Sequence, residues 1–153
     1  MAAKTGHQMK LYRNTGSVAS PTWTLIDQIG DVNIPDFSRA VAELKRRGNN
    51  YTKNLPGIIN TIALEFRLFH GVGATIFEAL RDNFLAGTIE EFAVLDGLVA
   101  TVGTQGLRCP FLIEAFPWDQ NLDEVSGHDL RLVIGYMESA GSEVDPSWME
   151  VSA

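Results

Sequence analysis

The stretch NLPGIINTIALEFRLFHGVG, residues 54–73, decides the fold class because its residues alternate from Ile58 onward, with an apolar residue at every second position from Ile62 to Leu68. The alternating sets are Ile62, Leu64, Phe66 and Leu68 on one side, and Thr61, Ala63, Glu65 and Arg67 on the other. A period of two is typical of a β-strand with one buried face. We therefore expect one long strand over residues 58–69, whose polar face needs a separate explanation.

Several other segments show the same period. Strands are expected at residues 8–14, 22–29, 107–116 and 128–138, and a hairpin at residues 88–102 with a tight turn at Asp96 and Gly97. These segments predict a mainly β fold, a β-sandwich or small barrel of about six to eight strands flanked by one α-helix. Residues 1–138 are expected to form this domain, and residues 139–153 an acidic C-terminal tail or arm.

One helix is predicted, beginning at Ala74 and ending at Ala86. Thr75 and Glu78 have the spacing of a capping box, and Gly87 stands where a helix C-cap belongs. The apolar stripe that would face the sheet consists of Ile76, Phe77, Leu80 and Phe84.

Residues 36–47 fit two structures. Asp36 or Ser38 could cap a helix that Gly48 ends. Ala40, Ala42 and Leu44 also alternate with polar neighbours, as in a strand. Local propensity alone leaves the choice between helix and strand open, because tertiary context overrides it.

Charge is unevenly distributed along the 153 residues, whose net charge is −7. Residues 1–60 hold eight Lys and Arg against four Asp and Glu, whereas residues 61–153 hold four against fifteen. An acidic protein is disfavoured as a non-specific ligand of nucleic acid or anionic lipid. The asymmetry predicts contact between opposite ends of neighbouring copies, unless folding mixes the two halves in space.

Residues that could carry chemistry are few. His7, His70 and His128 stand apart at no metal-ligand spacing, and the Gly71 and Gly73 loop lacks a phosphate-binding signature. Cys109 alternates with apolar residues and is predicted to be buried; as the single cysteine it favours a reducing compartment. The first ten residues contain no apolar run, so no secretory signal is expected. We predict no catalytic, cofactor-binding or metal-binding residue, and no enzyme.

The order of the segments resembles that of the tail tube proteins of long-tailed bacteriophages. An early strand with Trp23 is followed by Asp31, by an Arg-bearing segment with Arg39, and by the Pro56-Gly57 turn that opens the long strand. The resemblance covers roughly residues 8 to 137.

This resemblance implies a β-sandwich with a flanking helix, six copies in a ring, and rings stacked into a tube through which viral DNA passes without specific binding. It also favours the strand structure for residues 36–47, within a hairpin that contacts neighbouring subunits. The expected partners are further copies of the chain and tape-measure, terminator and baseplate-type tail proteins, with no membrane and no cofactor. The expected location is the virion tail, after assembly in the host cytoplasm.

Two sets of site residues follow as expectations. Arg39, Lys45, Arg46 and Arg47 are expected at an inter-subunit interface. Strand position alone assigns Glu65, Glu90 and Asp129 to the lumen of the tube. Two alternatives remain, namely another tail or connector component, such as a terminator or a secretion-tube-like ring protein, and a small-ligand-binding β-barrel.

Overall fold

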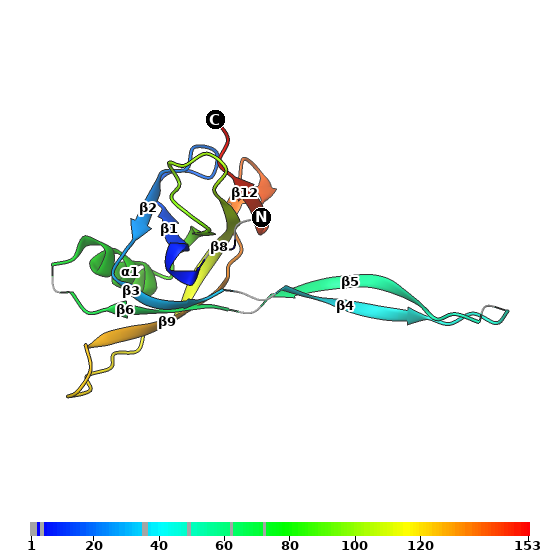
Figure 1. The fold of residues 1–153 in the computed structure, drawn as a ribbon, viewed down its shortest axis with the longest axis horizontal. Coiled ribbons are helices and arrows are strands. Elements are labelled where there is room, and N and C mark those ends of the chain that lie inside the picture. Colours follow the sequence, from blue (N-terminus) through cyan, green and yellow to red (C-terminus); the bar gives the residue numbers. More distant parts are fainter. Residues whose placement is uncertain (1–2, 4, 35–36, 49, 62, 72) are drawn as a thin grey trace.

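Strands dominate the computed structural model, which describes residues 3, 5–34, 37–48, 50–61, 63–71 and 73–153 (Figure 1). Asp36 and Ile62, on which the sequence-based predictions drew, lie outside the described residues. The elements are a short 3-10 helix at Gly6–Gln8, one α-helix, α1 (Thr75–Ala86), and β1 (Lys10–Asn14), β2 (Trp23–Ile26), β3 (Ile29–Asn33), β4 (Phe37–Leu44), β5 (Lys53–Thr61), β6 (Leu64–Phe69), β7 (Ile89–Leu95), β8 (Gln105–Ala115), β9 (Gly127–Ile134), β10 (Glu138–Ser139), β11 (Ser142–Glu143) and β12 (Ser147–Glu150).

The main sheet has eight strands in the order β2-β1-β7-β8-β9-β6-β3, with β12 paired to β8. Its two edge strands, β2 and β3, are joined by only Asp27 and Gln28, so the sheet must curl until its edges lie close together. The single strand predicted over residues 22–29 is therefore wrong. The chain leaves one edge of the sheet there and enters the other.

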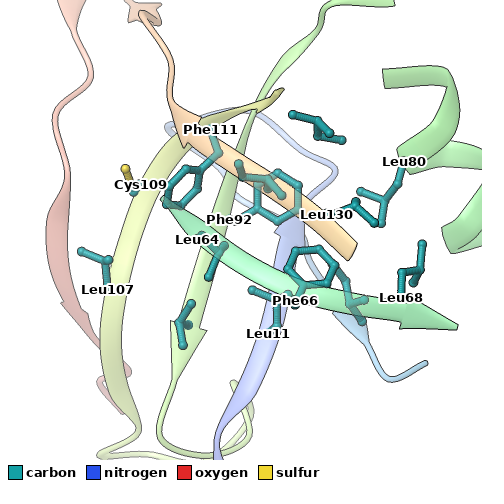
Figure 2. Close-up of a cluster of buried hydrophobic side chains, with 14 of the residues drawn as sticks. Leu11, Leu64, Phe66, Leu68, Leu80, Phe92, Leu107, Cys109, Phe111 and Leu130 are labelled. Carbon is teal, nitrogen blue, oxygen red and sulfur yellow. The ribbon is translucent and has the colours of Figure 1, made fainter. Parts of the chain in front are cut away.

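A core of apolar side chains fills the curled sheet (Figure 2). Phe66, Phe92 and Phe111 come from three different strands and are each at most 3% exposed. Leu64 and Leu68 are also buried, which confirms the predicted apolar face of this segment. Ala63, predicted on the polar face, is buried as well.

The long strand predicted over residues 58–69 is two strands. β5 ends at Thr61 and pairs with β4, whereas β6 begins at Leu64 and pairs with β3 and β9. In the sequence, apolar and polar residues keep alternating between β5 and β6, although the two strands belong to different sheets. Local periodicity therefore indicated strand structure correctly but not the point where the partner changes.

Helix α1 packs its predicted stripe on the core, where Phe77 and Leu80 are buried. Gly87 has φ 65°, in the left-handed region, and its N–H donates to carbonyls of the last turn, as a C-cap should. The capping box is wrong, because Ala74 is the N-cap and no side chain caps it. Thr75 is already inside the helix and cannot act as its cap.

The hairpin predicted over residues 88–102 is wrong in its second strand, because β7 pairs instead with residues 106–112 of β8. Gly97 does not adopt a positive φ, and residues 98–102 do not continue as a strand. Instead, Val99 packs on a second buried cluster around Tyr12, whose hydroxyl accepts a hydrogen bond from the Val99 N–H at 3.1 Å. Tertiary packing thus replaces the two-residue turn that Asp96 and Gly97 predicted.

The C-terminal residues contribute strands to the fold. β10 pairs with β11, and β12 pairs with residues 105–108 of β8. β9 pairs with residues 111–115, and β7 pairs with β8 along nearly its whole length, so β9 and β12 share the opposite side of β8. The division of the chain at residue 138 stays a prediction.

Candidate interaction surfaces

The β4–β5 hairpin, residues 37–61, projects from the rest of the molecule as an arm (Figure 1). Among the described residues, β4 and β5 pair only with each other. Residues 37–44 form a strand, so the strand structure that the resemblance favoured for this segment is confirmed. The helix that local propensity allowed does not form, because β4 pairs with residues of β5 that lie 9 to 24 positions further along the chain.

Both faces of the arm expose apolar side chains. The register places Phe37, Val41 and Ile59 on one face, whereas Leu55 lies opposite Ala42 on the other. Val41 is 63% and Ile58 79% exposed. An isolated two-stranded hairpin is marginally stable in water, and exposed apolar surface of this kind marks an interaction site.

A bulge interrupts the arm between Arg39 and Val41. A Cβ on Gly57 would lie 2.8 Å from the carbonyl oxygen of Ala40, so this position requires glycine. Arg39 is exposed and donates a hydrogen bond from Nη1 to the Gly57 carbonyl at 3.2 Å. The Arg39 side chain therefore stabilises the bulge through a hydrogen bond inside its own hairpin.

The end of the arm is basic. Residues 45–53, which we call the arm tip, contain Lys45, Arg46, Arg47 and Lys53 and no acidic residue. Lys45 pairs with Glu43 at 3.2 Å, whereas Arg46 and Arg47 are exposed and form no ion pair among the described residues. Residues 37–61 carry five Lys and Arg against one Glu, and the remaining residues carry seven against eighteen Asp and Glu. The folded chain keeps a charge asymmetry, because the arm carries a net positive charge and the rest of the molecule a net negative charge.

The outer face of β6 and β9 is a second polar surface. Glu65 pairs with Arg131 at 2.7 Å across the two strands, and Arg67 pairs with Asp129 at 3.3 Å. An open depression of about 540 Å³ lies over this face. Its polar lining consists of Asp31, Asn33, Glu65, Arg67, Asp129 and Arg131. The polar side of β6, left unexplained by the sequence, is thus held by cross-strand ion pairs.

Glu90 lies elsewhere. Its carboxylate pairs with Arg13 at 2.8 Å and accepts a hydrogen bond from Asn83 of α1 at 2.6 Å. Its side chain is 15% exposed. Of the three residues assigned to the lumen, the structure brings Glu65 and Asp129 onto one face and places Glu90 beside the helix.

Two histidines that stand apart in the sequence meet in the structure. The His128 Nδ1 lies 3.0 Å from the Pro117 carbonyl, which only accepts, so this nitrogen carries a proton and leaves Nε2 as an acceptor for His70 Nδ1 at 3.1 Å. Trp118 stacks on His70 with ring centroids 4.9 Å apart. Burial is the main cause that lowers the pKa of His128. Strand register alone could reveal this pair, because His128 lies opposite Leu68 across β6 and β9.

Cys109, which could have carried chemistry as a nucleophile, is instead part of the core. Cys109 is fully buried in the core, as predicted, and burial raises the pKa of its thiol to about 12. Within the described ranges, no three or more His, Cys, Asp or Glu side chains come together as metal ligands. No described helix has the length and hydropathy of a membrane span.

Comparison with known proteins finds a likeness in the fold alone. No protein-family model and no curated sequence matches the chain. Among solved structures, a chain of the anti-feeding prophage baseplate is 14% identical with a TM-score of 0.63, covering 100% of this chain and 99% of the other. A chain of the tail of an empty gene transfer agent particle with C6 symmetry is 15% identical with a TM-score of 0.64, covering 94% and 98%. The SPP1 tail tube protein is 15% identical with a TM-score of 0.68, covering 87% and 77%. The chain therefore has the fold of these tail and baseplate proteins.

Proposed function

We propose that this protein is a structural subunit of a phage-type virion tail. Copies of the chain assemble into hexameric rings that stack into a tube, and viral DNA passes through the tube into the host without specific binding. The protein catalyses nothing in this role. Its other partners are tail components of the tape-measure, terminator and baseplate type.

The observation that carries the proposal is the arm. Its two apolar faces have no covering element among the described residues of the chain, so a second copy must cover them if they are to leave water. An arm that lies on a different surface of the next copy makes a heterologous contact, which generates rings or filaments. The likeness to tail and baseplate proteins supports the same conclusion from the fold.

The outer face of β6 and β9 suits the lumen. Glu65 and Asp129 are each held in an ion pair, and the face also carries Asp31 and Glu114 near Arg67 and Arg131. A face with more carboxylates than guanidinium groups repels phosphate weakly, and DNA then slides along it without binding. We leave Glu90 out of the lumen because its carboxylate lies beside α1, away from this face, and is only 15% exposed.

Electron microscopy of the purified protein, together with sedimentation at several concentrations, tests this function. Hollow tubes or stacked rings are the expected result. A monomer that persists at high concentration and at both low and high salt would remove the proposal.

A single-ring component of the tail is the second candidate, since the anti-feeding prophage baseplate chain matches over the full length of this chain. Isolated rings that never elongate in the same micrographs would favour it. We do not propose a small-ligand barrel, because the aromatic side chains of Phe66, Phe92 and Phe111 fill the interior of the sheet.

A further inference from the structure

The loop between β8 and β9, residues 116–126, exposes apolar side chains although it is well ordered by hydrogen bonds. Trp118 is 57%, Val125 66% and Leu122 fully exposed. Monomeric proteins gain nothing from three large apolar side chains held in water on one short loop. We call residues 116–126 the acceptor loop.

Hydrogen bonds from the body and within the loop hold the acceptor loop in place. Arg67 Nη2 donates to the Val125 carbonyl at 3.1 Å, and Trp118 Nε1 donates to Ser126 Oγ at 2.9 Å. His128 donates to the Pro117 carbonyl at 3.0 Å, and Ser126 Oγ donates to the Asp119 carbonyl at 2.9 Å. A loop ordered before binding loses little entropy on association, so its apolar surface is prepared for a partner.

The charges of the acceptor loop complement those of the arm tip. The loop contains Asp119, Asp123 and Glu124 and no Lys or Arg. Asp119 is engaged by Arg67, but Asp123 and Glu124 are exposed and form no ion pair with any described residue. The arm tip likewise has Arg46 and Arg47 exposed and without a carboxylate partner in the described chain. Complementary exposed charges steer association and fix its register.

Intramolecular contact between these two surfaces is excluded by their positions. Figure 1 shows the acceptor loop as the gold loop beside β9 at one end of the longest axis, and the arm tip at the opposite end. The arm tip of one copy can therefore reach only the loop of another copy. Such a head-to-tail contact repeats without limit or closes into a ring.

We propose that the arm tip docks on the acceptor loop of a neighbouring copy. Arg46 and Arg47 pair with Asp123 and Glu124, and the apolar side chains of Trp118, Leu122 and Val125 pack under the arm. This inference rests on the proposed self-assembly and names the surface that receives the arm.

Matched charge reversals test the contact. The loop variant is Asp123→Lys with Glu124→Lys, and the arm variant is Arg46→Glu with Arg47→Glu. Each variant alone should require at least tenfold more protein to assemble than the wild type in sedimentation at low salt. An equal mixture should assemble again, because every arm tip then finds a loop of opposite charge on the other variant. Circular dichroism checks that each variant folds.

The control variant is Glu143→Lys with Asp145→Lys, which makes the same change in net charge as the loop variant at two exposed acidic residues elsewhere. It should assemble like the wild type. If the loop variant assembles like the wild type, or if the mixture fails to assemble, the docking inference is wrong while the tube proposal stands.

A cross-linking experiment measures the contact even if no tube forms. Arg47→Cys protein mixed with Glu124→Cys protein should give a disulfide-linked dimer under mild oxidation, whereas neither protein alone should give it in comparable yield. The native Cys109 does not interfere because it is fully buried. Absence of the mixed dimer would overturn the inference, whatever the micrographs show.

Discussion

The body and the arm of this protein satisfy the same physical requirements in opposite ways. In the body, strands from distant parts of the chain enclose an apolar core, and the charged side chains of β6 and β9 pair across the sheet. In the arm, two strands pair only with each other among the described residues, and apolar side chains lie exposed on both faces.

This difference separates folding from assembly. The body holds the interactions that determine the stability of the single copy, whereas the arm contributes little until another copy covers it. Substitutions in the body should therefore change the free energy of unfolding, whereas substitutions in the arm should change the protein concentration needed for assembly.

The largest effect on stability is expected in the body. Phe92→Ala removes a ring that is 1% exposed in the core, and should lower the free energy of unfolding by about 3–5 kcal/mol. Chemical denaturation of the monomer measures it. The matched substitution in the arm, Ile58→Ala, truncates a side chain that is 79% exposed. It should leave the denaturant concentration at the midpoint of unfolding nearly unchanged. A comparable loss from both would show that the arm packs on its own body.

The largest effect on assembly is expected in the arm. Ile58→Asp places a charge on the apolar surface that a second copy should cover, and should raise the protein concentration needed for assembly by about tenfold or more. Analytical ultracentrifugation measures the shift. The thermal unfolding of the monomer should not change. Assembly at the wild-type concentration would show that this position stays in water.

Alkaline pH should destabilise the body through Cys109. Burial raises the pKa of its thiol to about 12, so the unfolded chain loses this proton at a lower pH than the folded protein. Stability therefore falls as the pH rises above the pKa of a free thiol and towards 12. Cys109→Ala should flatten this part of the stability curve. Equal curves for the two proteins would contradict the assignment.

Acid pH should have the smallest of the four effects, through His128. Burial lowers the pKa of this imidazole, and His70 and Arg67 act in the same direction, whereas the hydrogen bond to the Pro117 carbonyl and the charge of Asp129 oppose them. The unfolded chain therefore binds a proton first as the pH falls below about 6.5, and stability declines towards the lower pKa of the folded protein. His128→Gln should reduce this decline in denaturation curves between pH 7 and pH 5. An unchanged slope would locate the acid sensitivity in other groups.

Strand structure and burial were readable from the sequence where they depend on neighbours along the chain. The alternation of Leu64, Phe66 and Leu68 correctly predicted their buried face, and Gly87 correctly predicted the end of α1. The basic residues of the arm tip were visible as a cluster because they are adjacent in the sequence. Each of these features is set by local geometry, which the order of residues specifies directly.

Strand pairing was decided only by the tertiary structure. The sequence could not show that residues 54–73 divide between two sheets, that His70 meets His128, or that Glu90 turns towards α1 while Glu65 and Asp129 share a face. Alternation reports that a segment is extended and which side chains point together, but it carries no information about the partner strand. Partners are chosen by contacts between residues far apart in the chain, and those contacts exist only after folding.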